Sequence, residues 1–378
     1  MQDEITQAVL ARDDVAKYLR GDDDESKLQA RERIQGYLDE LRTTQRYKMY
    51  RALRHPLYPI LRKVERRPEH LEHPRRASAA GRVIYISNHR SHLDYLVELL
   101  VLDEAKLRPP IIAAGINLFG GALGLLHRHV TGAIPIRRDA KDPAYLATLK
   151  AYIAELLKTH DLFFYPEGGR SYSGELKSLK TGLLQASLHA DRQHLSFVPC
   201  AVSYDLVLED RILSKQGTKR RQRPFSREVA EMASAAVGFA SRGFVTFGEP
   251  IPLSDWDPDS RRDVVQLTHV VRDRIGRLMK VLPTALVAQS FRPGQSRDDL
   301  VERVGRLLEA LEALGANIDE RNPVAATDCG IDQLVSRGVL AADRRGVRVR
   351  DRIVLKYYAR TIDHLVAASK ADPAPAAR

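Results

Sequence analysis

The sequence predicts an α/β fold, in which helices lie on the faces of a central sheet. The first observation is that strand-like and helix-like segments alternate between residues 82 and 252. The second is length, because 378 residues can bury a sizeable core and hold two or three structural units. We expect a basic helical N-terminal region (1–80), an α/β core (81–255) and a mostly helical C-terminal region (256–378).

The composition narrows the possible partners. A formal charge of +11 and a pI near 9.6 imply an anionic partner, such as nucleic acid, an acidic protein, a phosphorylated substrate or a lipid surface. The two cysteines, Cys200 and Cys329, exclude a disulfide scaffold and favour a reduced, cytoplasmic setting. The N-terminus has no signal-peptide pattern. The most apolar window, 111–126, is shorter than the roughly 20 residues of a membrane span, although a shallow membrane contact stays open.

The N-terminal region changes character along its length. Residues 1 to about 45 are typical of polar helices, whereas 46–76 contain ten Lys or Arg against three Glu, interleaved with apolar residues. Such a segment can lie on an anionic bilayer. A solvated helical face that leads into the core is the alternative.

The core is expected to contain six strands and four helices. Functional groups should gather where its strands end. The strand-like segments are 82–87, 110–114, 132–136, 161–165, 196–203 and 243–247, and the helix-like segments are 91–104, 119–128, 142–158 and 179–190.

The first of these strands ends in Ser-Asn-His-Arg-Ser-His-Leu-Asp, residues 87–94. A His beside a carboxylate that can hold its ring is the basic unit of a general base. We therefore predict a pair of His89 and Asp94. The spacing of Ser91 and Asp94 also fits a helix-capping box. A metal site is a further alternative that neighbouring arginines disfavour, so no metal is expected; its ligands would be His89, His92, His127 and His129.

Two later strand ends predict anion binding. Arg137 and Arg138 close the strand 132–136, and a guanidinium can grip a phosphate through two hydrogen bonds, although a solvated strand end has the same pattern. After the strand 161–165, a pair of glycines between charged residues allows backbone N–H groups to approach an anion. The residues of this loop are Glu167, Gly168, Gly169, Arg170 and Ser171, with Lys180 downstream.

Two further segments carry weaker signals. Pro199 interrupts an apolar strand, which predicts an edge or a bulge and suits a site wall, to which we also assign Ser91. Residues 215–227 contain six Lys or Arg and no acid, as a solvated loop or a dock for an acidic partner would.

The C-terminal region predicts helices at 260–282, 298–314 and 328–338. A basic hairpin around 339–350 follows the last of them, as in a winged-helix unit. A nucleic-acid-binding protein is therefore the rival interpretation. It leaves residues 87–205 unexplained, and we expect no nucleic-acid partner. Binding to a phosphate backbone would fall steeply with salt.

In chain order, these stretches resemble the four motifs of glycerolipid acyltransferases. The His-x4-Asp of residues 89–94 is similar to the first motif, 132–138 to the second, 167–171 to the third and 198–199 to the fourth. The doubled glycine of the third motif most resembles the glycerol-3-phosphate acyltransferase branch, since the lysophosphatidate branch usually carries Glu-Gly-Thr-Arg. Residues 114–118, 203–205 and 355–360 add to that likeness. The resemblance covers about residues 80–250, and the tail weakly.

The resemblance implies a glycerolipid-acyltransferase-like mixed sheet flanked by helices. It also implies an enzyme without a cofactor that moves a fatty acyl group from acyl-CoA or acyl carrier protein to the first hydroxyl of glycerol 3-phosphate. His89 would take the hydroxyl proton, Asp94 would fix the ring, and the arginines would hold the phosphate. The enzyme would lie on the inner face of the cell membrane. Dihydroxyacetone phosphate and lysophosphatidate are the alternative acceptors.

One departure from the family pattern affects the phosphate site. The family often continues its third motif with Arg-Thr-Gly-Arg, whereas this chain has Tyr-Ser-Gly-Glu at 172–175. The grip on the phosphate is then left to Arg137, Arg138, Arg170 and Lys180.

Overall fold

The computed structural model describes residues 2–20, 23–42, 64–116, 133–137, 140–216, 240–343 and 346–371. At its centre lies a mixed sheet in the order β1-β7-β6-β2-β5-β3-β4, with β8 beside β6. Strand β6 runs parallel to β2 and antiparallel to β7 and β8. The strands are β1 (Val64–Glu69), β2 (Arg82–Ser87), β3 (Ile111–Gly115), β4 (Ile134–Ile136), β5 (Leu162–Phe164), β6 (Leu195–Tyr204), β7 (Ser241–Phe247) and β8 (Ile251–Pro252).

Helices cover both faces of the sheet, as the sequence predicted. Successive side chains of a strand point to opposite faces, so neighbouring β2 residues join different cores. Tyr85 packs with α6 (Asp94–Glu104) and the C-terminal helices, whereas Ile84 and Ile86 pack with α8 (Pro143–Leu156) and α12 (Arg261–Leu278). The remaining core helices are α5 (Glu72–Ala80), α9 (Gly182–Leu188) and α10 (Asp210–Gln216).

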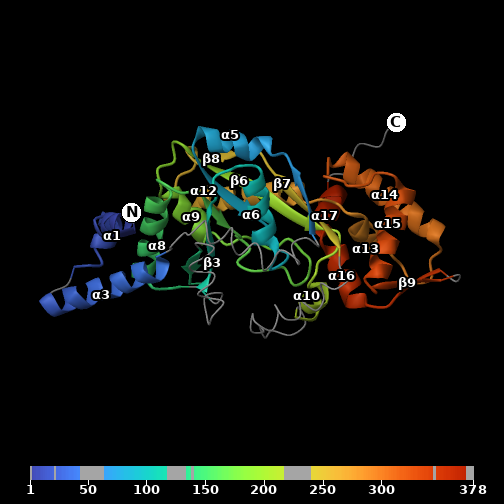
Figure 1. Ribbon diagram of the computed structural model, residues 1–378, viewed down its shortest axis with the longest axis horizontal. Coiled ribbons are helices and arrows are strands. Elements are labelled where there is room, and N and C mark those ends of the chain that lie inside the picture. Colours follow the sequence, from blue (N-terminus) through green and yellow to red (C-terminus); the bar gives the residue numbers. More distant parts are fainter. Residues whose placement is uncertain are drawn as a thin grey trace.

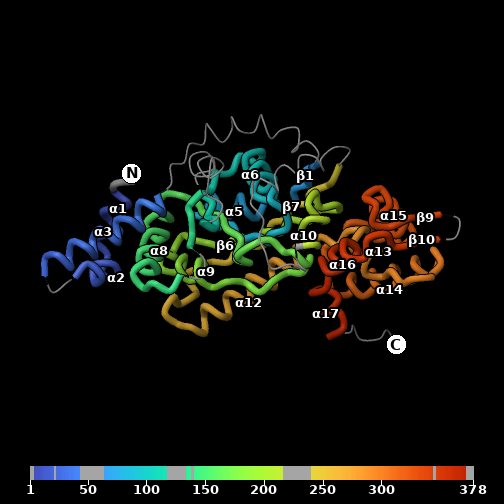
Figure 2. The backbone as a smooth tube through the Cα atoms, turned by 90° about the horizontal axis from the view of Figure 1, so that it is seen from below, coloured from blue at the N-terminus to red at the C-terminus, as the bar shows by residue number. Residues whose placement is uncertain are grey.

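The two ends of the chain lie at opposite ends of the molecule, with the sheet between them (Figures 1 and 2). The N-terminal helices rest on α8 and comprise α1 (Gln2–Leu10), α2 (Asp13–Ala16) and α3 (Asp24–Leu41). The C-terminal part is mostly helical, as expected, with one small hairpin. Its elements are α13 (Pro283–Ser290), α14 (Arg297–Ala313), α15 (Pro323–Ser336), β9 (Leu340–Asp343), β10 (Gly346–Val349), α16 (Arg352–Arg360) and α17 (Asp363–Ala371).

Strand β1 corrects the expectation that the chain before residue 81 is helical. It forms one edge of the sheet and pairs in parallel with β7. Val64 is its one fully buried side chain, and Pro68 is tolerated because an edge strand has an open side. The strand is held by main-chain hydrogen bonds to β7. Its sequence is rich in Glu and Arg and shows no apolar alternation, so the sequence did not predict a strand there. The division of the chain into three regions stays a prediction.

Pro199 lies in a central strand, not at an edge as the sequence suggested. On one side it pairs with Ile86 of β2. On the other side of β6, Pro199 lies in a gap: the residues before it pair with β8 and the residues after it pair with β7. The Pro199 carbonyl oxygen on that side accepts a hydrogen bond from the Gly248 N–H at 2.8 Å. The missing N–H of the proline therefore costs no ladder hydrogen bond.

Other differences concern helix limits. The helix expected at 260–282 ends earlier, at Leu278, and α13 is a separate helix that the sequence did not predict. Pro283 occupies the first turn of α13, where its missing N–H is harmless. The last expected helix begins earlier, at Pro323, where the Asn322 side chain caps α15. The segments 119–128 and 217–227 lie outside the described residues. Within the described part of the chain, no helix has the length and hydropathy that a bilayer span requires.

One buried histidine predicts acid sensitivity. Burial lowers the pKa of His364 to about 4, and its Nε2 bonds the carbonyl oxygen of Gly276 at 3.0 Å. The unfolded chain takes up a proton near pH 6.5 whereas the folded chain does not, so stability falls as the pH drops below 6.5. We expect urea unfolding to show that wild type loses roughly 2 kcal/mol more than His364→Gln between pH 7 and 4.5. Equal losses would contradict this assignment.

Candidate active site

The predicted pair of His89 and Asp94 is formed. Strand β2 ends at Ser87 and α6 begins at Asp94, so the intervening turn brings the two side chains together. His89 Nδ1 lies 2.9 Å from Asp94 Oδ2, and the Asp94 carboxylate is fully buried. Asp94 also accepts the backbone N–H groups of Arg90 (2.5 Å) and Ser91 (2.8 Å). The Asp94 carboxylate thus holds both the His89 ring and the backbone of the turn before α6, whereas the N-cap residue of α6, Leu93, makes no side-chain cap.

Aromatic packing fixes the plane of the His89 ring. It stacks on Tyr165 with ring centroids 4.1 Å apart and planes inclined by 11°. The hydroxyl of Tyr165 donates to Glu98 Oε2 at 2.7 Å, and the hydroxyl of Ser87 donates to the other oxygen at 2.5 Å. The imidazole is therefore held in both position and inclination, with Nε2 left for another molecule.

Glu98 is a buried carboxyl group close to Asp94. Burial raises its pKa well above the usual range, and the charge of Asp94 raises it further. This shift favours a neutral Glu98. No role was predicted for Glu98 or Tyr165 from the sequence. Glu98 lies four residues after Asp94 and is the one charged residue between Leu96 and Leu102, and that isolated charge was a signal that could have found it.

The glycine loop, residues 167–171, makes hydrogen bonds to the backbone of His89. Glu167 is buried, and its two oxygens accept the backbone N–H groups of His89 (2.9 Å) and Lys177 (3.0 Å). The Ser171 N–H donates to the His89 carbonyl oxygen at 2.9 Å. Glu167 and Ser171 therefore fix the main chain of His89, which differs from the phosphate contact that the sequence suggested.

A cavity of about 570 Å³ opens beside His89. Gly168, with φ of 70°, Gly169 and Lys180 line it, together with Arg137. Most of the other lining side chains are apolar and come from β3, β4, β5 and α8; examples are Ile112, Ala113, Ile136, Leu146, Leu149 and Phe164. An imidazole thus faces a space that combines an apolar wall with two cationic side chains.

Five residues that the sequence assigned to the phosphate site or the site wall do not line this cavity: Glu167, Arg170, Ser171, Pro199 and Ser91. Glu167 and Ser171 lie behind His89, as described. The guanidinium of Arg170 is buried over the Tyr172 ring, 5.7 Å from its centroid, and 3.9 Å from Glu209. Pro199 is buried within β6.

Ser91, which the sequence placed in the site wall, is also away from the cavity lining. It is buried, and its hydroxyl donates to Glu209 Oε2 at 2.5 Å. The backbone N–H of His92 donates to the other oxygen of Glu209 at 2.8 Å. Glu209 therefore holds the turn between β2 and α6, although no sequence motif contains it.

Arg137 is held by α3. Its guanidinium makes three hydrogen bonds to the Glu40 carboxylate, at 2.8, 3.2 and 2.6 Å. It also lies 5.1 Å from the ring centroids of Tyr37 and Tyr145. An anion that binds Arg137 in the cavity must compete with Glu40. Arg138 lies outside the described residues, as do His127 and His129 of the metal alternative.

Residues 65–203 match the family model described as Acyltransferase. The matched segment contains the motif residues from His89 to Pro199, and the match supports the predicted class of enzyme. The family match does not assign a role to any of these residues.

Curated relatives point to one branch of the acyltransferases. The chain is 29% identical over 323 residues to the glycerol-3-phosphate acyltransferase of Haemophilus influenzae strain PittEE, covering 75% of this chain and 39% of that protein. It is 29% identical over 339 residues to the enzyme of the same name from Actinobacillus succinogenes, covering 79% and 41%. The chain thus spans about two fifths of the length of these relatives.

Among solved structures, the chain resembles the 1-acyl-sn-glycerophosphate (LPA) acyltransferase PlsC from Thermotoga maritima. The TM-score is 0.37 at 15% sequence identity, and the match covers 69% of this chain and 85% of that one.

Proposed function

We propose that this acyltransferase moves a fatty acyl group from a thioester, acyl-CoA or acyl carrier protein, to the first hydroxyl of glycerol 3-phosphate, giving lysophosphatidic acid. The observation that carries the proposal is the His89–Asp94 pair beside a cavity with an apolar wall and two cationic side chains. The apolar wall suits an acyl chain, and Arg137 and Lys180 suit a phosphate. The names of the curated relatives agree with this acceptor.

In the proposed reaction, His89 Nε2 accepts the proton of the acceptor hydroxyl as its oxygen attacks the thioester carbonyl carbon. Asp94 holds Nδ1–H and stabilises the imidazolium that forms. When the tetrahedral intermediate collapses, the C–S bond breaks and the imidazolium returns its proton to the thiolate. The products are the ester and a free thiol, and the imidazole is neutral again.

We further propose that the enzyme works at the anionic inner face of the cell membrane. Its product is a membrane lipid precursor, the chain carries a formal charge of +11, and residues 46–76 combine basic and apolar side chains.

The purified protein, given glycerol 3-phosphate and either thioester, is expected to release one thiol for each lysophosphatidic acid formed. Dihydroxyacetone phosphate and lysophosphatidate serve as competing acceptors, and mass spectrometry of the products identifies the acylated position. We expect kcat/KM to be highest for glycerol 3-phosphate. Equal kcat/KM for lysophosphatidate would contradict the proposed acceptor, and thiol release without ester formation would contradict acyl transfer.

A further inference from the structure

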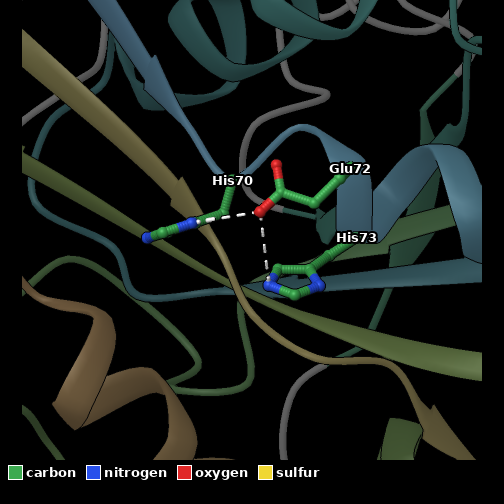
Figure 3. A group of neighbouring side chains, drawn as sticks. All are labelled: His70, Glu72 and His73. Atoms are coloured by element: carbon green, nitrogen blue, oxygen red, sulfur yellow. Dashed lines mark hydrogen bonds and ion pairs between the residues drawn. The ribbon is translucent and has the colours of Figure 1, made fainter.

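Two histidines and a glutamate form a cluster at the turn between β1 and α5. One donor atom from each of His70, Glu72 and His73 lies within 4.8 Å of the others, and none of the three lines the cavity beside His89. Figure 3 shows the Glu72 carboxylate between the two imidazoles. Glu72 Oε1 lies 3.2 Å from His70 Nδ1 and 3.8 Å from His73 Nε2.

These distances match the edges of a metal coordination shell. Imidazole nitrogens and carboxylate oxygens bind zinc at about 2.0–2.2 Å, which places neighbouring ligands of a tetrahedral ion about 3.3–3.5 Å apart. The two measured separations bracket that value. Two nitrogens and one oxygen are the ligands of a borderline transition metal, whereas magnesium and calcium prefer oxygen alone.

The backbone is shaped to bring the ligands together. The His73 N–H donates to the His70 carbonyl oxygen at 3.2 Å, which closes a turn around Leu71 and Glu72. His70 has φ of 59°, in the left-handed region that few residues other than glycine adopt. Strain of this kind persists only where the surroundings hold it, and it gathers at functional sites. The left-handed residue here carries one of the three donor atoms.

A fourth residue, Glu249, lies beside one of these histidines, within ion-pair distance of a buried ring nitrogen that makes no hydrogen bond. Glu249, on the connection between β7 and β8, places Oε1 3.5 Å from His73 Nδ1, the nitrogen that faces away from Glu72. A metal-bound histidine almost always gives its second nitrogen to a carboxylate or carbonyl oxygen, which fixes the tautomer. Arg76 pairs with Glu249 and compensates its charge.

We propose that His70, Glu72 and His73 bind a divalent transition-metal ion of the zinc class, with Glu249 as the positioning residue of His73. The ion would join the end of β1, the start of α5 and, through Glu249, the connection after β7. The site is separate from the proposed catalytic pair, and no step of the proposed acyl transfer uses it.

Titration calorimetry with Zn²⁺ on tag-free, metal-stripped full-length protein tests the proposal. Wild type is expected to bind Zn²⁺ at this site and to show no binding of Mg²⁺ at the same concentration. Loss of an outer carboxylate typically costs about 10–100-fold in metal affinity, and we expect this for Glu249→Gln. His70→Asn and His73→Gln each remove a ligand and are expected to weaken binding by more than about 100-fold.

Asparagine is chosen at position 70 because it tolerates left-handed backbone, so this variant should fold. His269→Ala removes an exposed histidine of α12 and is the matched control, with unchanged affinity. At a Zn²⁺ concentration about 100 times the Kd, the Tm should rise by roughly 3 °C in wild type and in this control only. The proposal fails if wild type binds no Zn²⁺, or if His70→Asn and His73→Gln bind it as tightly as wild type.

Discussion

Replacement of His89 by alanine is expected to lower kcat for acyl transfer by roughly 10²–10⁴-fold, the contribution of a positioned general base. His89 is fixed by Asp94 at Nδ1, by the Tyr165 ring and by the Glu167 contact to its backbone. Alanine leaves no group to accept the hydroxyl proton, because the Asp94 carboxylate is buried and occupied. KM for both substrates should change little, since His89 is proposed to act on the reacting hydroxyl and not on the phosphate. Thiol release at saturating substrate measures both constants.

Asp94→Asn tests the second member of the pair. Asp94 accepts four hydrogen bonds, from His89, Arg90, Ser91 and Tyr204. The NH2 group of asparagine would face at least one of these four donors and could not accept its hydrogen bond. We expect a loss in kcat comparable to that of His89→Ala, and a double variant no worse than the single ones, because the two residues act as a unit. His269→Ala, on the surface of α12, is the control for replacing a histidine. Wild-type kcat in His89→Ala would rule out the proposed base.

The sequence located the pair of His89 and Asp94 because its two members are close along the chain. His89 and Asp94 are five residues apart, on a turn whose flanking strand and helix have clear patterns. The direction of a side chain is harder to predict. Glu167 and Arg170 were grouped with the phosphate ligands because charged residues flank a glycine pair. Only the packed structure shows that Glu167 turns inward to the backbone of His89.

Contacts between distant segments were beyond the sequence. Glu40 pairs with Arg137 across 97 positions, and no periodicity links an N-terminal helix with a strand end. His70 lies in the segment 46–76, whose basic charge predicted a surface segment. Because β1 was not predicted there, the position of His70 at the end of a strand was not predicted either. Long-range packing, not local propensity, decides such positions.

Arg137→Ala is expected to lower kcat/KM for the phosphorylated acceptor by roughly 10–10²-fold. A hydrogen bond to a charged group contributes about 1.5–3 kcal/mol, and each 1.4 kcal/mol is about tenfold. Most of the loss should be in KM for glycerol 3-phosphate, with KM for the thioester nearly unchanged. Arg137→Lys should fall between, because lysine keeps the charge and loses the planar fork. Initial rates over a range of glycerol 3-phosphate measure the effect.

Glu40→Gln should act in the opposite direction, because the phosphate must displace the Glu40 carboxylate from Arg137. The pair is partly exposed, with 41% of the Arg137 side chain accessible, and such pairs contribute only about 0.2–1 kcal/mol. KM for glycerol 3-phosphate should therefore fall by roughly 1.5–5-fold, and by less at high salt, where the pair is screened. If Glu40→Gln raised this KM, Glu40 would orient Arg137 instead of competing for it. An unchanged KM in Arg137→Ala would remove Arg137 from the phosphate site and leave Lys180 as the cationic residue to replace.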